Sequence, residues 1–422
     1  MTIESRIILE FTRRHNLFVP YMLTEGGIMT RIATGLDQLR EKSWRDLRGQ
    51  SLGLLANQAS VDRNLINVKN LIASLVPGQL KILFGPQHGF RGEDQDNMVE
   101  TADHVDPELH IPAVSLYGTK ADRLSSFLDA IDTLVIDLQD VGTRVYTFIA
   151  TMLSCLKSAS KAGKRILVLD RPNPLGGTIL EGHLLRPEFK SLVGPFPLPM
   201  RHGMTMGELA CLFQNACNID CELAVVPLRG WSRHMLWKDT GLPWVMPSPN
   251  MPLPETAQVY PGQVIWEGTN ISEGRGTCRP FEICGAPFIN PSVIKGQLGP
   301  EDTQGCHLQE YWFRPTFNKW HNELCGGFMI HVLNPHLFRP YGTTLRLLKT
   351  IRETYPDEFA WRNPPYEYEF ERLPIDLILG DPSIRIALEG GKASRDLVEG
   401  CSEELHGFLE LRQPFLMYKQ EG

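Results

Sequence analysis

The 422-residue chain lacks the features that define several common classes of protein. It has no run of 18 apolar residues, so no membrane-spanning helix is predicted. Lys and Arg form no dense block and the net charge is −7, so neither nucleic acid nor an anionic membrane is expected as a partner. The motifs G-x-G-x-x-G after a strand, G-x-x-x-x-G-K-[ST], G-x-S-x-G and H-E-x-x-H do not occur. Nucleotide, serine-hydrolase and zinc-peptidase chemistry therefore lack their usual motifs.

The nine cysteines form no recognisable framework. Their number is odd and no C-x-x-C pair occurs, which argues against a zinc site and against a set of disulfides. Several of them lie among apolar neighbours in predicted helices, as buried free thiols do. Free thiols persist in a reducing compartment, so a cytoplasmic location is expected.

Residues 1–28 are not predicted to be part of the folded core. Their short apolar runs are interrupted by Glu10, Arg13 and Arg14, and no small-residue cleavage site follows, so a signal peptide is not indicated. Met29 opens a segment with the pattern of an ordinary start. We expect a disordered extension, or an over-extended translation start, that packs little against the rest.

Short apolar runs alternate with helical patterns from residue 51 onward. The apolar runs at 52–56, 82–84, 114–117, 134–136 and 166–169 are continuous, as strands buried on both faces of a parallel sheet are. Apolar residues at 145–156 recur with helical spacing. Thr205 and Glu208 form a capping box that begins another helix. This alternation predicts an α/β fold with a largely parallel, doubly wound, Rossmann-like sheet.

The pattern changes near residue 286. Polar, Gly-containing stretches follow at 290–310, and the remainder has fewer parallel-strand signals. A strand at 328–332 and a helix beginning with 345–351 remain. We expect a Rossmann-like domain over 29–285, which carries the site loops, and a smaller C-terminal α+β domain over 286–422.

Polar side chains gather where the predicted strands end. In open α/β sheets, ligands bind outside the carboxyl ends of the strands. So many amides, carboxylates and guanidinium groups at one edge suit a neutral, hydroxyl-rich ligand, although any one of them can instead cap a loop. The candidates that follow the strands are Asn57, Gln87, His88, Arg91, Asp140, Arg144, Tyr146, Arg171, Asn173, Arg201 and His202.

Two later loops are expected to lie over this edge. Prolines hold 247–252 extended, and 267–277 is polar, carries two carboxylates and is rich in Gly, which allows backbone to approach a ligand closely. These loops add Asn250, Asn270, Arg275 and Glu273 to the candidates.

Eight ordered motifs carry a resemblance to a known family. They are LFGPQHGFRG (83–92), SLYG (115–118), DLQDVGTRVYTF (137–148), LDRPNPLGG (169–177), RHGMTMGELA (201–210), PSPNMP (247–252), VYPG (259–262) and EGTNISEGRGT (267–277). From about residue 35 onward the chain resembles the NamZ-type exo-β-N-acetylmuramidases. The resemblance implies a Rossmann-like domain and a smaller C-terminal domain with the site between them. It also implies release of terminal N-acetylmuramic acid from peptidoglycan-derived chains, without a metal or organic cofactor.

One residue departs from the family pattern. The family usually reads Glu-His-Gly where this chain has Gln87-His88-Gly89, and that Glu is its favoured catalytic candidate. A glycosidase generally needs a carboxylic acid and a second group at the anomeric carbon, although the amide of a 2-acetamido sugar can serve as the nucleophile. Glutamine cannot donate an acid proton. The carboxylates available for that role are Glu93, Glu100, Asp137, Asp140, Glu267 and Glu273.

Among these carboxylates, Glu273 and Asp140 are favoured because they lie in the two densest polar motifs, and Glu93 is the alternative. Two other functions remain open because of Gln87. One is hydrolysis of a different sugar or linkage, and the other is carbohydrate binding without catalysis. The expected partner is an amino-sugar glycan or muropeptide, and the sequence does not predict the oligomeric state.

Overall fold

The computed structural model describes residues 31–41 and 44–419. The extension predicted over residues 1–28 lies outside these ranges. Among the described residues, none of the helices is both long enough and apolar enough to cross a bilayer.

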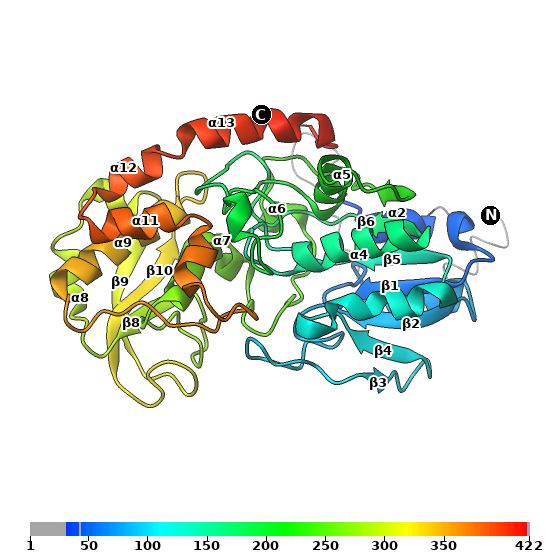
Figure 1. Cartoon of the computed structure of the whole chain (residues 1–422), viewed down its shortest axis with the longest axis horizontal. Coiled ribbons are helices and arrows are strands. Elements are labelled where there is room, and N and C mark those ends of the chain that lie inside the picture. Colours follow the sequence, from blue (N-terminus) through cyan, green and yellow to red (C-terminus); the bar gives the residue numbers. More distant parts are fainter. Residues whose placement is uncertain (1–30, 42–43, 420–422) are drawn as a thin grey trace, which may run out of the picture. The chain divides into compact units, whose positions relative to one another are not determined.

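A seven-stranded sheet forms the first half of the described chain, in the order β3-β4-β2-β1-β5-β6-β7 (Figure 1). All its neighbouring pairs are parallel except β3 with β4. The strands are β1 (Leu52–Ala56), β2 (Leu80–Gly85), β3 (His104–Val105), β4 (Pro112–Ser115), β5 (Thr133–Asp137), β6 (Arg165–Leu169) and β7 (Leu223–Val226). β1 and β5 are buried along their whole length, which is why both contain a continuous apolar run, although Thr133 and Asp137 at the two ends of β5 are buried polar residues.

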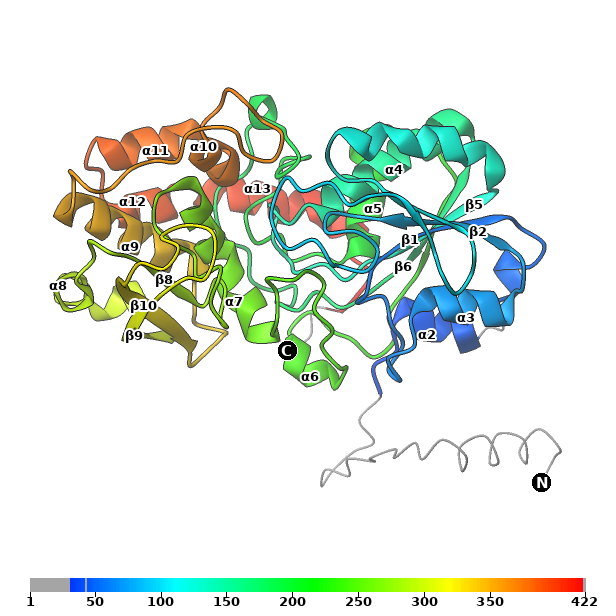
Figure 2. The same cartoon turned by 90° about the horizontal axis from the view of Figure 1, so that it is seen from below.

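Helices cover both faces of this sheet. Figure 2 shows α2 (Gly35–Glu41) and α3 (Val68–Leu75) on one face, with α4 (Phe148–Ala162) and α5 (Met206–Ala216) on the other. The capping box predicted from the sequence begins α5, since Thr205 and Glu208 exchange side-chain-to-backbone hydrogen bonds of 3.0 and 3.3 Å. The doubly wound, Rossmann-like prediction is therefore confirmed.

A smaller antiparallel sheet follows, in the order β8-β10-β9. Its strands are β8 (Ile283–Ala286), β9 (Cys306–Phe313) and β10 (Cys325–Val332). The helices α7 (Pro254–Gln263) and α9 (Pro340–Thr354) pack beside it. The predicted strand at 328–332 lies in β10, and the predicted helix at 345–351 lies in α9. β8 crosses the expected domain boundary at residue 286, and the boundary itself stays a prediction.

Helices and 3-10 segments make up the remaining elements. They are the helices α6 (Trp237–Thr240), α8 (Pro291–Lys295), α10 (Pro374–Leu379), α11 (Pro382–Glu389), α12 (Ser394–Glu399) and α13 (Ser402–Arg412), and the 3-10 turns η1 (Arg45–Leu47), η2 (Gly118–Ala130), η3 (Pro187–Phe189), η4 (Val264–Gly268), η5 (Pro300–Thr303) and η6 (Gln413–Phe415).

One continuous core joins the two sheets. A single cluster of buried apolar side chains includes Phe84 on β2, Ile136 on β5, Trp266 on η4, Ile330 on β10 and Leu345 on α9. The segment after α9 adds a second connection, because α13 leads the chain back towards α5 (Figure 1). The two sheets are therefore held in one compact unit, and loops from both can form one pocket.

Candidate active site

The polar strand ends meet at one edge of the seven-stranded sheet, as predicted. Asn57, Gln87, Asp140 and Asp170 follow β1, β2, β5 and β6, and these four strands are neighbours in the order β2-β1-β5-β6. The side chain of Asn57 donates a 2.8 Å hydrogen bond to the backbone oxygen of Pro247, so it ties the proline-rich loop to this edge.

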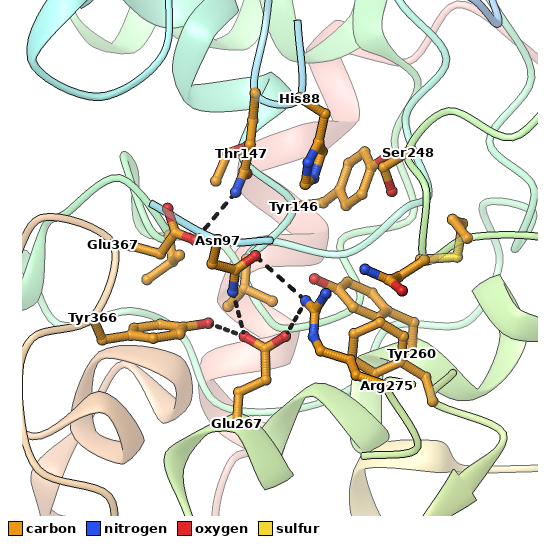
Figure 3. A pocket seen from close by; sticks show the side chains of 16 residues that line it. His88, Asn97, Tyr146, Thr147, Ser248, Tyr260, Glu267, Arg275, Tyr366 and Glu367 are labelled. Atoms are coloured by element: carbon orange, nitrogen blue, oxygen red, sulfur yellow. Dashed lines mark hydrogen bonds and ion pairs between the residues drawn. The ribbon is translucent and has the colours of Figure 1, made fainter. Parts of the chain in front are cut away.

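A pocket opens beside this edge and takes residues from both halves of the chain (Figure 3). It is lined by Gln87, His88, Asn97, Val145, Tyr146, Thr147, Val193, Ser248, Asn250, Met251, Tyr260, Glu267, Arg275, Phe281, Tyr366 and Glu367. Its free space is about 30 Å³, which holds only about two water molecules. The residues around the pocket must therefore move apart to admit a sugar.

Glu267 is held as a carboxylate by three donors. Arg275 donates from Nη2 to Oε1 at 2.7 Å, and Oε2 accepts from the Tyr366 hydroxyl at 2.6 Å and from the Asn97 amide at 3.3 Å (Figure 3). Burial alone would lower the pKa of Arg275, but the charges of Glu267 and Glu273 outweigh it and raise that pKa. The guanidinium therefore stays charged and supports the anionic form of Glu267.

Glu367 is held in the opposite way, by neutral donors only. Its carboxyl accepts from the Tyr117 hydroxyl at 2.6 Å and from Nε2 of Gln87 at 3.2 Å. No Lys, Arg or His in the described ranges forms an ion pair with it. Burial is the largest cause that raises the pKa of Glu367, to about 7. This carboxyl can hold a proton near neutral pH and give it up, as a general acid must.

A strained turn presents Glu367 to the pocket. Tyr366 and Glu369 exchange two backbone hydrogen bonds of 2.9 Å around the two central residues, Glu367 and Tyr368. Both central residues have left-handed φ values, 49° and 63°, which such turns usually assign to Gly or Asn. Each costs on the order of 1–3 kcal/mol and persists only where packing enforces it.

Packing around Tyr368 holds the turn in this conformation. Its ring lies edge-on to Tyr117 at 5.4 Å between centroids. It also covers Gly118, where a β-carbon would come within 2.4 Å of the ring. The SLYG motif (115–118) therefore has a structural role. Tyr117 orients the Glu367 carboxyl, and Gly118 leaves room for the turn that carries Glu367.

Gln87 supports Glu367 from the sheet side. Its Oε1 accepts from the Thr147 hydroxyl at 2.5 Å, so its Nε2 points towards Tyr117 and Glu367. His88 follows with a left-handed φ of 72°, and its Nδ1 lies 2.6 Å from the backbone oxygen of Asp94. Burial lowers the pKa of His88 to about 4, so the ring is neutral at pH 7.

Five of the predicted site residues line this pocket, and the three favoured carboxylates do not. The five are Gln87, His88, Tyr146, Asn250 and Arg275. Glu273 lies behind Arg275, where both its oxygens are paired, with Arg275 at 3.2 Å and Lys319 at 2.7 Å. Burial would raise the pKa of Glu273, but the charges of Lys319 and Arg275 lower it, so it holds no proton to donate.

Asp140 and Glu93 also lie outside the pocket lining. Asp140 is buried and accepts a 2.6 Å hydrogen bond from the backbone of Gly142, with Nε2 of His202 at 3.4 Å. It shapes the loop after β5. Glu93 is exposed to solvent, as is Arg91. The density of polar residues in the sequence therefore pointed to the loops of the site but not to the side chains that face its interior.

The remaining arginines stabilise loops. Arg144 is fully buried and donates to the backbone oxygens of His183, Leu198 and Ile378. Arg171 pairs with Asp137. The other predicted candidates also bond to backbone: Arg201 to Leu175, Asn173 to Met204, His202 to Met204 and Asn270 to Glu358.

Sequence reasoning missed Glu367 and its donor Tyr117, and it missed Tyr366 and Asn97, which donate to Glu267. The one local signal is the alternation of aromatic and acidic residues in Tyr366-Glu367-Tyr368-Glu369, directly after two prolines. Glu267 was counted among the available carboxylates but not favoured. Nothing local shows that a turn near the end of the chain contacts the end of β2.

The fold and the pocket together define a class of enzyme. A Rossmann-like sheet carries a pocket with one glutamate paired with an arginine and one protonatable glutamate, and glycoside hydrolysis generally requires two such carboxyl groups. The comparisons agree with this class. The chain belongs to the exo-β-N-acetylmuramidase NamZ family, whose N-terminal model matches residues 52–255 and whose C-terminal model matches residues 258–418.

Individual relatives extend this result over nearly the whole chain. The peptidoglycan β-N-acetylmuramidase NamZ of Bacillus subtilis (strain 168) is 38% identical over 388 residues, which cover 92% of each protein. A DUF1343 family protein of Bacteroides fragilis, solved by crystallography, superimposes with a TM-score of 0.83 at 28% identity, over 92% of this chain and 99% of that one. A second Bacteroides fragilis protein of that family has a TM-score of 0.71 at 24% identity and supports the fold alone.

Proposed function

We propose that this chain is an exo-acting glycosidase that releases terminal N-acetylmuramic acid from peptidoglycan-derived chains. The observation that carries the proposal is the pair of glutamates in one pocket, Glu267 paired with Arg275 and Glu367 with a pKa of about 7. The family and the activity named for the Bacillus subtilis relative support the choice of sugar.

Glu367 is the proposed general acid. Its proton passes to the glycosidic oxygen as the bond to the anomeric carbon breaks, and the carboxylate that remains is held by the Tyr117 hydroxyl and the Gln87 amide. Both donors favour the carboxylate, so they offset part of the cost of burying the charge that the proton leaves behind. A later water molecule can return its proton to the same oxygen.

Glu267 is the proposed stabiliser on the other side of the sugar. Its oxygens already accept hydrogen bonds from Arg275, Tyr366 and Asn97, which makes it a weak nucleophile. A 2-acetamido sugar brings its own nucleophile. Glu267 then accepts the acetamide N–H while the acetamide oxygen closes on the anomeric carbon.

The position of Glu367 determines how the glutamine at position 87, where the family usually has Glu, affects catalysis. Glutamine at this position removes one carboxyl, but Glu367 still supplies an acid within 3.2 Å of it. The catalytic proposal is therefore favoured over carbohydrate binding without catalysis, which would need no protonatable group in the pocket.

We also propose that the enzyme works in a reducing, cytoplasmic compartment. All nine cysteines lie in the described ranges and each is a free thiol. Burial raises the pKa of Cys155, Cys284 and Cys306 to about 12, so these thiols stay protonated and unreactive.

The test is hydrolysis of a chromogenic β-N-acetylmuramide beside the matching β-N-acetylglucosaminide. The wild-type chain should cleave the muramide preferentially. Glu367→Gln should lower kcat about 10²–10⁴-fold, the usual contribution of a general acid. Glu371→Gln, an exposed glutamate four residues further on, is the matched control and should keep the full rate. Full activity of Glu367→Gln, or no cleavage of the muramide by the wild type, would refute the proposal.

A further inference from the structure

A second and larger cavity lies close to the catalytic pocket. Its volume is about 430 Å³, which is in the usual range for small-molecule sites. It is lined by Thr269, Asn270, Asn318, Lys319, Trp320 and Arg362. None of these six residues lines the catalytic pocket, so the cavity is a separate site.

One aromatic ring separates this cavity from Glu267. The guanidinium carbon of Arg362 lies 6.0 Å from the centre of the Tyr366 ring, and the hydroxyl of the same ring donates to Glu267. The backbone holds this relation in place, because Arg362 donates to the oxygen of Gly268 at 2.9 Å, one residue beyond Glu267. A ligand in the cavity therefore lies within a short distance of the proposed catalytic carboxylate.

The cavity offers one free cation and one flat apolar face. Lys319 is saturated, since its ammonium donates to Trp266, Ile271 and Glu273. Arg362 forms no ion pair and no side-chain hydrogen bond within the described part of the chain. The indole N–H of Trp320 donates to the Asn270 oxygen at 2.6 Å, which leaves only the ring to contact a ligand.

The loop that carries Trp320 is strained. Asn318, Trp320 and Asn322 all have left-handed φ values, 68°, 57° and 63°. Asn tolerates this conformation, but it is unusual for a bulky residue such as Trp and costs on the order of 1–3 kcal/mol at Trp320. The hydrogen bond of the Trp320 indole and a 2.9 Å bond from Arg314 to the Asn322 oxygen hold the loop. Such strain is typical of a loop that positions a binding group.

We propose that this cavity binds a carboxylate-bearing sugar unit on the leaving-group side of the same glycan chain. Trp320 stacks on the C–H face of the ring, and Arg362 receives the carboxylate in a two-pronged ion pair. The inference rests on the proposed function, because it takes the catalytic pocket to hold the terminal sugar. A lactyl carboxylate of a further N-acetylmuramic acid unit has the required chemistry.

The kinetic test compares a substrate that fills only the catalytic pocket with one that reaches the cavity. The first is the chromogenic β-N-acetylmuramide, and the second is a peptide-free glycan fragment with a further N-acetylmuramic acid unit. Arg362→Gln should raise KM for the fragment about 10–100-fold, with kcat unchanged, since a charge-assisted hydrogen bond is lost. Trp320→Ala should also raise KM with kcat unchanged, because the sugar ring loses the aromatic face on which it stacks. Both variants should leave the kinetics of the chromogenic muramide unchanged.

Two comparisons make the result specific. Arg48→Gln removes an exposed arginine near η1 and is the matched control, which should alter neither substrate. The same fragment with only the carboxyl group of the further unit reduced to an alcohol should show a high KM with the wild type and no further rise with Arg362→Gln. Equal KM values for wild type and Arg362→Gln on the acidic fragment would overturn the proposal.

A binding measurement separates this proposal from the proposed function. Calorimetry with Glu367→Gln, which should not turn the fragment over, measures its affinity directly. Combining Arg362→Gln with Glu367→Gln should lower the affinity for the acidic fragment to the affinity measured for the reduced fragment. If the wild type fails to cleave the muramide but this difference in affinity persists, only the proposed function fails. If the wild type cleaves the muramide and the affinity difference is absent, only the cavity proposal fails.

Discussion

At the scale of single residues, the buried carboxyl of Glu367 links activity to stability. Its pKa is about 7 in the folded chain and 4.5 in the absence of burial. The folded state therefore binds this proton more tightly than the unfolded state does. The stabilisation is complete below pH 4.5 and is lost as the pH rises through 7, because the buried charge then forms no ion pair with any described residue.

Glu367→Gln should consequently be more stable than the wild type at pH 8.5 and show a smaller gain, or none, at pH 5. A shift of this size corresponds to about 3 kcal/mol at most. Urea denaturation at the two pH values measures the difference. Glu371→Gln should show no such dependence, and an equal effect of both substitutions would contradict the assigned role of burial.

The same burial predicts the pH dependence of Gln87→Glu. A second carboxyl within 3.2 Å of Glu367 would share its proton and raise the apparent pKa of the pair. The falling limb of kcat/KM should move to higher pH, by about one unit or more, while the maximal rate stays equal or decreases. A pH–rate profile of wild type and variant checks this. A large gain in maximal rate would instead mean that position 87 is the true place of the acid.

At the scale of elements, the turn at Tyr366–Glu369 is the part of the site whose position depends most on packing. Gly118→Ala would place a β-carbon 2.4 Å from the Tyr368 ring and push the turn away from Tyr117. The hydrogen bond from Tyr117 to Glu367 should lengthen, and kcat should fall about tenfold or more.

Gly78→Ala is the control for backbone strain. Gly78 has a left-handed φ of 75°, close to the 67° of Gly118, but open space around its β-carbon position. Both substitutions should lower the melting temperature, because an L-residue at positive φ costs roughly 1–2 kcal/mol, and Gly118→Ala should lower it further through its clash with the Tyr368 ring. Only Gly118→Ala should lower kcat, and equal kcat values would show that the turn does not set the position of Glu367.

At the scale of the whole molecule, the end of the described chain joins the second half back to the first sheet. Arg412 donates to the backbone oxygen of Gly203 at 2.9 Å, and Met417 donates its backbone N–H to Glu208 at 2.9 Å. Tyr418 donates its hydroxyl to Asp170 at the end of β6. Burial raises the pKa of Asp170 to about 6, so this carboxylate depends on its hydrogen-bond donors at pH 7.

Tyr418→Phe should lower the free energy of unfolding by about 1–3 kcal/mol at pH 7.5, because it leaves a buried carboxylate with one donor fewer. Tyr311→Phe is the control, since no hydrogen bond joins the Tyr311 hydroxyl to the described residues. Urea denaturation measures both. A loss of equal size in the two variants would show that the end of the chain contributes only packing.

The sequence by itself determined the local elements of this fold and the polar residues that follow the strands at one edge of the sheet. Continuous apolar runs predicted β1 and β5 because strands buried on both faces are mostly apolar. The capping box of Thr205 and Glu208 predicted the start of α5 because its hydrogen bonds span only three residues. These inferences held because each depends on neighbours along the chain.

Only the tertiary structure decided which carboxylates face the pocket. Glu273 and Asp140 lie in the richest polar motifs, yet Lys319 and Arg275 pair with Glu273, and Asp140 bonds the backbone of Gly142 outside the pocket lining. Glu367 lies 280 residues from Gln87, and their contact forms because the C-terminal part of the chain packs against the end of β2. Its pKa is a property of that burial. No pattern of neighbouring residues encodes it, because desolvation depends on everything that surrounds the carboxyl in space.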